Sequence, residues 1–461
     1  MARLQVGVWL GTLSLVLATT GRLPGAEAPS RPNILLLVTD DQRWDALGAA
    51  GNRLIRTPHL DRLAAGGVLF KNCFCTTSIC ATSRASLLCG QWARRHGIHD
   101  FATSFSPQAW RQTFPAVLRR CGYRVGFVGK WGVGRTLPRQ QYDFFAGFAG
   151  QGRYFDPKRP QHMTDYLTDQ AVKFLQGCTP DEPFCLQVSF KAAHCQDGQP
   201  WRLQFQPAKR YASLYQQVTI PPPLTAREEY FRRLPPFLQT SEARRRWQVR
   251  FANPEMFQYS VKNYYRLITG VDDAVGRMLA VLRQRKLDRN TVVIFTSDNG
   301  FYLGDYGLAG KWFMHEPSIR LPLVIYDPRL PRELTGRQLE PMVLTVDLAP
   351  TILELAGAPV PAAMQGRSLV PLLQGRCTRW RQEFFYEHLF RHRRIPQSEG
   401  VRTRRWKYVR YLLPEGPYEQ LFDLETDPHE LHDLARQRQH QNVLRLLRRR
   451  CDELARQLAA K

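Results

Sequence analysis

The chain has 461 residues, 43% of them hydrophobic, and a formal net charge of +25 at neutral pH. This length allows one large domain and a smaller one, with ample buried core. Its ten cysteines include no Cys-x-x-Cys pair, so the sequence does not support a zinc ribbon.

Residues 2 to 28 have the three regions of a secretory signal: Arg3, an apolar run over residues 6–18, and Ala26-Glu27-Ala28, after which we expect cleavage. The run is short for a bilayer span, and no later run is long enough, so we expect no stable membrane insertion. The sequence predicts an exported protein, periplasmic or extracellular; an uncleaved anchor is the alternative. An oxidising compartment would allow some cysteines to pair, but their connectivity cannot be deduced.

The positive charge would attract polyanions over long distances. Nucleic acid is one such partner, but no nucleic-acid-binding module is visible, and the signal sequence points outward, so no nucleic acid is expected. A sulfated polysaccharide agrees with both observations. An arginine-rich, solvated surface without a selected partner explains the charge equally well.

Apolar runs and helical spacing alternate along most of the chain. Continuous apolar runs predict buried strands at residues 33–38, 68–70, 122–130, 184–190, 291–296, 322–326 and 342–344. Apolar spacing predicts helices at residues 57–63, 115–120, 164–175, 259–283 and 348–355. This alternation predicts an α/β fold with a large mixed, mostly parallel central sheet flanked by helices.

The character of the chain changes near residue 376. Short antiparallel strands are expected at residues 384–388, 400–404 and 407–411, followed by a charged helix from about residue 439 to 458. We therefore predict a signal peptide at 1–28, a catalytic domain at 29–376 and a smaller C-terminal α+β subdomain at 377–461. Residues 196–253, with their proline clusters, are expected to form an insertion with helical pieces that contributes substrate-side loops.

Two predicted central strands end in oxygen-bearing side chains. Asp40 and Asp41 follow the first strand, and Asp298 and Asn299 follow the strand at 291–296. If the strands are neighbours, these side chains converge at the carboxyl edge of the sheet, where α/β folds bind ligands. Such hard oxygen donors suit Ca²⁺ and, less securely, Mg²⁺. Each pair alone is equally well explained by turn or cap residues.

The stretch at residues 79–91, ICATSRASLLCGQ, predicts a helix for which Thr82 and Ser83 are N-cap types. Cys80 would then lie at a helix N-terminus that favours an anion, with Arg84 one turn further on. An inert, buried thiol is the alternative for Cys80.

This stretch resembles the signature of the sulfatase family, with Ser83, Arg84 and Gly90 at the expected spacing from Cys80. The resemblance implies that a formylglycine-generating enzyme oxidises Cys80 to formylglycine, whose hydrate is the nucleophile. It further implies a metal site formed by Asp40, Asp41, Asp298 and Asn299 together with residue 80. The chain departs from the signature at Thr82, where the family most often has Pro.

Further residues match the family in order along the chain. Lys130, in Gly129-Lys130-Trp131-Gly132, resembles the lysine that contacts the nucleophile and the sulfate. Lys191 and His194 resemble a loop whose histidine meets the bridging ester oxygen, and Lys311 resembles a lysine that neutralises the sulfate. With Arg84, the lysines would stabilise the sulfate charge, and His194 would protonate the departing alcohol.

One family feature is missing, because Gly132 stands where a histidine often follows the lysine. His315, four residues after Lys311, is a possible substitute on the substrate side, and His96 and His99 are weaker candidates; each is more often an ordinary surface or capping histidine. The tail, with residues 421–424 and 427–431, resembles the small C-terminal subdomain of sulfatases.

The sequence therefore predicts a sulfuric ester hydrolase acting on a sulfated glycan. One alternative is a phosphodiesterase or phosphonate monoester hydrolase on the same fold. Another is an unconverted, non-catalytic binder of sulfated polysaccharide. The sugar, the sulfate position, exo or endo action and the oligomeric state stay open. Four aromatic residues of the insertion could stack on sugar rings or merely pack: Trp201, Phe205, Tyr211 and Trp247.

Overall fold

A computed structural model describes the chain except for residues 3, 6, 8–30 and 461. The predicted signal sequence lies largely outside the described residues. Arg31–Lys461 form one compact unit. Among the described residues, no helix is both long enough and apolar enough to cross a membrane.

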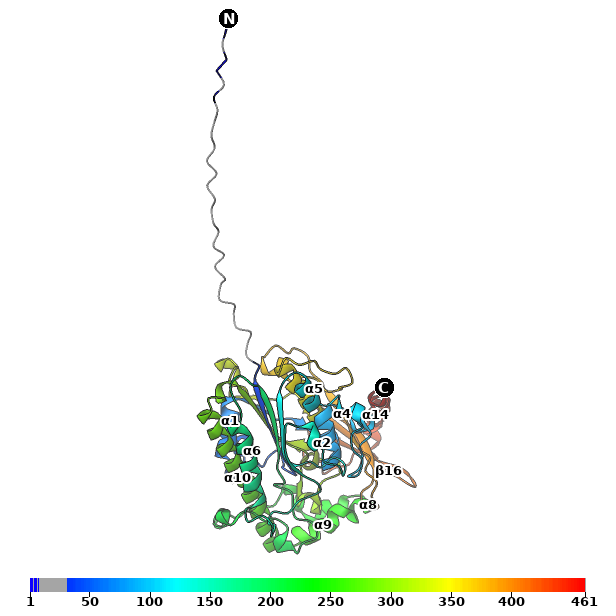
Figure 1. The fold of residues 1–461 in the computed structure, drawn as a ribbon. Helices are drawn as coiled ribbons and strands as arrows, with labels where there is room; N and C mark the ends of the chain where they lie inside the picture. The colour runs from blue at the N-terminus through cyan, green and yellow to red at the C-terminus, as the bar shows by residue number, and fades with distance from the viewer. Residues whose placement is uncertain (3, 6, 8–30, 461) are drawn as a thin grey trace. The chain divides into compact units, whose positions relative to one another are not determined.

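An eight-stranded sheet runs through the middle of this unit (Figure 1). In spatial order its strands are β12 (Arg337–Leu339), β2 (Val68–Phe70), β11 (Leu323–Tyr326), β7 (Thr291–Ser297), β1 (Asn33–Thr39), β6 (Phe184–Ser189), β4 (Arg124–Lys130) and β5 (Phe144–Phe148). β11 is antiparallel to both neighbours, and every other pairing is parallel. This confirms the predicted mixed, mostly parallel sheet. The edge strand β5 was not predicted.

The central strand β1 is apolar throughout because both faces of the sheet are covered. Leu35 and Leu37 pack into one core with α1 (Pro58–Gly66), α6 (Met163–Gln176) and α10 (Pro254–Gln284). Leu36 and Val38 pack on the opposite face with α2 (Cys80–Cys89), α5 (Phe114–Arg120) and α12 (Leu348–Leu355). Figure 1 shows α1, α6 and α10 on one side of the sheet and α2 and α5 on the other.

Helix α10 begins five residues before the predicted start. Asn253 caps it by accepting a 2.9 Å hydrogen bond from the Met256 amide, and Pro254 occupies the first turn. The predicted helical pieces of residues 196–253 include α7 (Glu228–Arg233), α8 (Pro236–Gln239) and α9 (Glu242–Arg250).

The smaller elements lie between and around these layers. The remaining short helices are α3 (Ala93–His96), α4 (Pro107–Trp110), α11 (Glu316–Ile319) and α13 (Val370–Leu373). β10 (Arg320–Leu321), β3 (Cys73–Phe74) and β13 (Val343–Leu344) form a three-stranded sheet, and β8 (Tyr302–Leu303) pairs with β9 (Ala309–Gly310). The predicted strand at 342–344 therefore lies outside the central sheet.

The C-terminal part contains an antiparallel sheet and a helix. Its strands are β14 (Glu383–His388), β15 (Ser398–Thr403), β16 (Trp406–Leu413) and β17 (Gly416–Asp423), followed by α14 (Gln441–Ala459). This confirms the predicted antiparallel subdomain, but β17 was not predicted. Its first half is polar and partly exposed, and pairing with β16 determines its conformation. The domain boundaries themselves stay predictions.

Candidate active site

Cys80 is the first residue of α2, so the helix begins two residues before the predicted caps. Ile79, in an extended conformation, takes the N-cap position and makes no side-chain cap. The prediction that Thr82 or Ser83 caps the helix was therefore wrong. Both lie inside it, and the Ser83 hydroxyl instead donates to the backbone carbonyl of Asp298. This hydrogen bond fixes the start of α2 against the end of β7.

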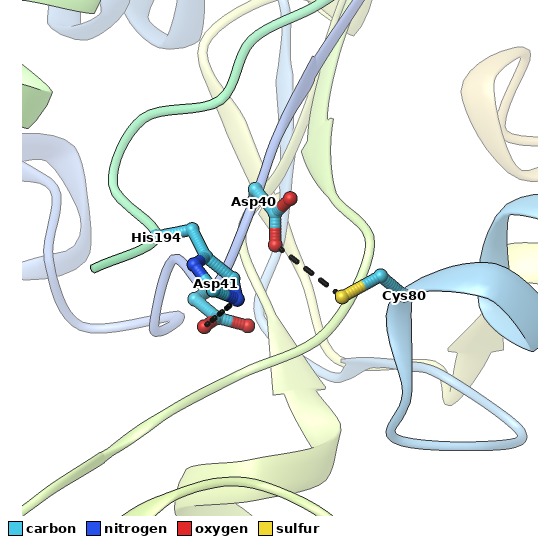
Figure 2. A group of neighbouring side chains, drawn as sticks. All are labelled: Asp40, Asp41, Cys80 and His194. Carbon is cyan, nitrogen blue, oxygen red and sulfur yellow. Dashed lines mark hydrogen bonds and ion pairs between the residues drawn. The ribbon is translucent and has the colours of Figure 1, made fainter. Parts of the chain in front are cut away.

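The carboxyl ends of β1 and β7 meet beside Cys80. The two strands pair in parallel with Thr39 opposite Ser297, so the residues that follow them are neighbours. The Asp41 amide donates to Asp298 Oδ1 at 3.3 Å, and Asn299 Nδ2 donates to Asp41 Oδ1 at 2.5 Å. Cys80 Sγ lies 3.7 Å from Asp40 Oδ1, and Figure 2 shows the two side chains pointing toward each other. The four oxygen-bearing residues thus come together with Cys80.

Three buried cations surround these carboxylates. Arg84 Nε donates to Asp298 Oδ2 at 2.8 Å, and its Nη2 lies 3.3 Å from Asp40 Oδ2. The Lys130 ammonium pairs with Asp40, while that of Lys311 pairs with Asp41 and lies 3.1 Å from Cys80 Sγ. All three side chains are at most 5% exposed, so their charges act in a medium with little water.

These charges set the protonation of the carboxylates. Burial alone would raise the pKa of Asp40, but the Lys130 ammonium and other cations hold it well below its usual range. Burial raises the pKa of Asp41 to about 6; the Lys311 ammonium opposes the rise, and Asp40 and Asp298 add to it. Burial and the Asp40 charge also raise the pKa of Asp298. Asp40 is therefore ionised beside its cations, whereas burial and the neighbouring carboxylate charges make Asp41 and Asp298 easier to protonate.

The loop after β6 brings His194 and Lys191 to the same place. His194 Nε2 lies 3.6 Å from Asp41 Oδ2, and its Nδ1 donates to the Cys195 carbonyl at 2.6 Å. Because a carbonyl only accepts, Nδ1 carries a proton and Nε2 faces the carboxylates. Lys191 Nζ lies 4.8 Å from the centre of the Tyr154 ring.

Both groups have lowered pKa values. Burial, followed by repulsion from Lys311, lowers the pKa of His194 well below its ordinary value. Burial and the Lys130 charge lower the pKa of Lys191 to about 8. Lys191 is therefore the cation of this site whose charge changes nearest to neutral pH.

Comparison with known proteins shows which family the chain belongs to. Residues 32–358, more than half of the chain, match the model of the sulfatase family. The chain belongs to the sulfatase family. It is therefore a sulfuric ester hydrolase, as predicted. Residues 304–457 also match the model of the N-sulphoglucosamine sulphohydrolase C-terminal region.

Known sulfatases can be aligned with most of the chain. The N-acetylglucosamine-6-O-sulfatase of Bacteroides thetaiotaomicron is 28% identical over 89% of this chain and 84% of its own length. The arylsulfatase of Clostridium perfringens is 26% identical over 91% of this chain and 93% of its own. A solved structure described as a complex with its substrate D-glucosamine-2-N,6-O-disulfate has a TM-score of 0.80 and 26% identity, and covers 93% of this chain and 98% of that one.

The donor atoms of this sulfatase fit a hard divalent cation. Asn299 Oδ1 is buried and, among the described residues, has no hydrogen-bond partner. It lies on the residue whose Nδ2 binds Asp41, so it belongs to the carboxylate group. One ligand atom from each of Asp40, Asp41, Cys80 and His194 lies within 4.8 Å of the others. Carboxylate and amide oxygens suit Ca²⁺ or Mg²⁺.

Gly132, where many sulfatases have histidine, leaves no room for a side chain. Its φ is +76°, and a Cβ there would lie 2.8 Å from Arg84 Cδ.

Gln151 also belongs to the site, although it was not predicted. Its Oε1 accepts a 2.6 Å hydrogen bond from the Lys130 ammonium. No pattern marks Gln151, because it lies in a loop after β5. It supplies a polar partner to the lysine that precedes Gly132.

The structure directs two of the proposed substitute histidines, His315 and His96, to partners other than Cys80. His315 Nδ1 lies 2.7 Å from the Tyr302 hydroxyl, and its ring packs 4.7 Å from that of Tyr306. Burial lowers its pKa to about 3, so it is a neutral core residue. His96 Nε2 lies 3.0 Å from Ser86 Oγ on α2. The expectation that His315 borders the substrate was wrong, because its ring points into a cluster of tyrosines.

Proposed function

We propose that this sulfatase hydrolyses a sulfate ester on a sulfated carbohydrate, using a formylglycine derived from Cys80 and a calcium ion. The observation that carries the proposal is the convergence of Cys80, three carboxylates and three cations in one buried group. The relative that acts on N-acetylglucosamine sulfate and the structure with a glucosamine disulfate support a sulfated sugar as substrate. The predicted export and a dependence on the formylglycine-generating enzyme belong to the same proposal.

The state of the Cys80 thiol argues against the unmodified cysteine as the nucleophile. Burial and the Asp40 charge raise its pKa to about 11, so it is a neutral thiol at pH 7 and a poor nucleophile. A hydrated aldehyde at position 80 would supply one hydroxyl to attack sulfur and a second whose deprotonation expels sulfate. An ordinary cysteine or serine lacks the second hydroxyl.

The calcium ion would be held by Asp40, Asp41, Asp298 and Asn299, and when bound it would supply positive charge to the sulfate and the nucleophile. The chain's own cations act on the same charge. Arg84, Lys130 and Lys311 are placed to bind sulfate oxygens once their carboxylate partners are occupied by the ion. Because these cations are buried, their attraction for a sulfate is little screened by water.

His194 is placed to protonate the departing alcohol from Nε2, because the Cys195 carbonyl holds the proton on Nδ1. Its lowered pKa leaves it neutral in the free protein. An arriving sulfate adds negative charge nearby and raises the pKa of the imidazole. Protonation of His194 would therefore accompany substrate binding.

The test is the Cys80→Ala variant, with Cys89→Ala as its control. Both cysteines are buried on α2, but Cys89 ends the helix and Cys80 begins it. We expect Cys80→Ala to abolish desulfation of an aryl sulfate and of sulfated monosaccharides, while Cys89→Ala keeps it. Full activity of Cys80→Ala would overturn the proposal. The mass of the tryptic peptide that contains Cys80 reports conversion directly, and an unchanged thiol mass in active protein would exclude formylglycine.

The same carboxylate and cation group could also act on phosphate or phosphonate esters. Rates on matched aryl sulfate, aryl phosphate and phenylphosphonate esters separate these activities. We expect the sulfate ester to be the fastest, and faster turnover of either phosphorus ester would reassign the substrate class.

A further inference from the structure

The loop between β14 and β15 presents an unneutralised run of basic side chains. Residues 391–394, here called the 391–394 loop, read Arg-His-Arg-Arg, and all four are exposed. Within the described part of the chain, none of the three arginines forms an ion pair. Three free guanidinium groups in four residues make a strong local positive potential.

This loop forms one wall of a cavity of about 430 Å³. Its lining contains no acidic residue, and an apolar side is provided by Phe237 of α8 and Leu412 of β16. Leu412 is 41% exposed, so its side chain is accessible from the cavity. A cavity with cations on one wall and apolar side chains on another is suited to a sugar that carries sulfate groups.

The backbone holds the loop in place before any ligand arrives. Ile395 is buried, and the Arg394 carbonyl accepts a 3.0 Å hydrogen bond from the Glu242 amide. The Arg394 amide donates to His392 Nδ1 at 3.2 Å, and Gln397 Nε2 donates to the Leu389 carbonyl at 2.5 Å. Binding a ligand therefore costs less conformational entropy than it would in an unattached loop.

Helix α9 connects this loop to the proposed catalytic group, which is Cys80 with the carboxylates and cations around it. Glu242 at its start contacts the loop, while Arg246 in its middle lies 4.9 Å from the Trp312 ring, next to Lys311. Arg250 at its end donates to Asp197, three residues after His194. Nine residues of helix span about 13 Å, so the 391–394 loop lies at one end of a short helix whose other end reaches the catalytic group. Figure 1 shows α8 near β16 of the C-terminal sheet, with α9 next to α8.

We propose that the 391–394 loop binds sulfate groups on a remote part of the glycan whose ester is being cleaved, so that the preferred substrate is an oligosaccharide with several sulfates. This inference rests on the proposed function. Because the two places are separated by the length of α9, a monosaccharide is too short to contact both, whereas an oligosaccharide is long enough. Net charge alone attracts any polyanion, but a fixed cavity with an apolar wall selects a sugar chain.

The test compares two triple variants of the full chain that lose the same charge. R391Q/R393Q/R394Q removes the loop's arginines, and R53Q/R56Q/R62Q removes three other exposed arginines that form no ion pair with any described residue. The first measurement is the affinity of each, in a Cys80→Ala background, for heparin at 50 and 200 mM salt. The second is the ratio of kcat/KM on a sulfated hexasaccharide to that on the corresponding monosaccharide.

We expect the loop variant to bind heparin about tenfold more weakly at low salt, with a shallower salt dependence, because three counterion-releasing contacts are lost. Its hexasaccharide-to-monosaccharide ratio should fall by a similar factor, and the control variant should match the parent. Equal losses in both variants, or none in the loop variant, would overturn the inference. Equal competition by single-stranded DNA would overturn it too, by showing a general polyanion site instead.

The two proposals fail separately. If the parent cleaves no sulfate ester but the loop variant alone loses heparin affinity, the proposed function is wrong and the glycan site stands. If the parent desulfates both substrates and the loop variant keeps the same ratio and affinity, the loop inference is wrong and the proposed function stands.

Discussion

The Tyr386 hydroxyl donates a 2.7 Å hydrogen bond to the backbone carbonyl of Trp312. It also lies 3.4 Å from the amide nitrogen of Ser78, two residues before Cys80. One side chain of the C-terminal sheet thus contacts both the segment that carries Lys311 and the segment that carries Cys80. Trp312 has a φ of +90°, which costs a non-glycine residue about 1–3 kcal/mol. The Tyr386 contact helps to hold this conformation.

Tyr386→Phe should lower the free energy of unfolding by about 1–3 kcal/mol, because it leaves the buried Trp312 carbonyl without its donor. It should also lower kcat roughly tenfold, since a small displacement of Lys311 weakens its contact with the transition state. Tyr408→Phe is the control: it removes a 2.6 Å hydrogen bond to Glu419, away from Cys80. Equal losses of kcat in the two variants, measured well below their unfolding temperatures, would refute a positioning role for Tyr386.

Gly132→Ala should impair the enzyme although alanine is the smallest possible addition. A positive φ costs an L-residue roughly 1–2 kcal/mol, and the new Cβ would lie 2.8 Å from Arg84 Cδ. Displacing Arg84 from Asp298 should lower kcat/KM by about ten- to a hundredfold.

Gly97→Ala separates these two effects. Gly97 has a φ of +74°, nearly that of Gly132, but nothing lies within 4 Å of the position that its Cβ would take. In denaturant titrations both variants should lose the stability that a positive φ costs, Gly132→Ala should lose more because Arg84 is displaced, and only Gly132→Ala should lose activity. The same argument predicts that Gly132→His, which restores the residue common in the family, does not raise the rate. A faster Gly132→His enzyme would contradict the steric account.

The sequence predicted the convergence of the carboxylates with Cys80 where a local pattern marked each residue. Asp40 and Asp298 each follow a continuous apolar run, and such runs become neighbouring central strands whose ends coincide. Gln151 had no such mark, because its contact with Lys130 depends on the path of an irregular loop. The position of His315 was predicted wrongly for a related reason. Its spacing of four residues from Lys311 suggests proximity, but the chain turns at Trp312 and directs the ring toward Tyr302.

Lys191 should give the pH profile of kcat/KM an alkaline limb, that is, a fall in kcat/KM at high pH. Its pKa is lowered to about 8, so its positive charge is lost as the pH rises through 8, and sulfate binding should weaken. We expect kcat/KM to fall above pH 8. In Lys191→Arg the limb should disappear, because arginine stays protonated. Lys173→Arg, an exposed substitution on α6, should keep it.

Unfolding does not explain this limb. Between pH 8 and the ordinary lysine value of 10.5, the unfolded chain binds more protons at position 191 than the folded chain does. The contribution of Lys191 to stability therefore rises with pH in this window. A limb that persists unchanged in Lys191→Arg would assign it to another group.

Calcium should stabilise the folded chain measurably, apart from any effect on turnover. Burial and mutual repulsion raise the pKa values of Asp41 and Asp298, so a divalent cation that neutralises them should favour the folded state. At a hundred times its Kd, the ion adds about 2.7 kcal/mol to the free energy of unfolding. Titration of chelator-treated protein with Ca²⁺ during thermal unfolding measures this rise, and Mg²⁺ should produce less.

Asp298→Asn should remove most of the calcium-dependent rise in the unfolding temperature, because the site loses one of its three carboxylates. Asp347→Asn is the matched control: Asp347 is also fully buried, but its carboxylate accepts the Leu344 and Arg367 amides, away from the ends of β1 and β7. That variant should respond to Ca²⁺ like the parent. If both variants keep the response, the ion binds elsewhere, and if the parent shows none, the carboxylates of β1 and β7 do not form a calcium site.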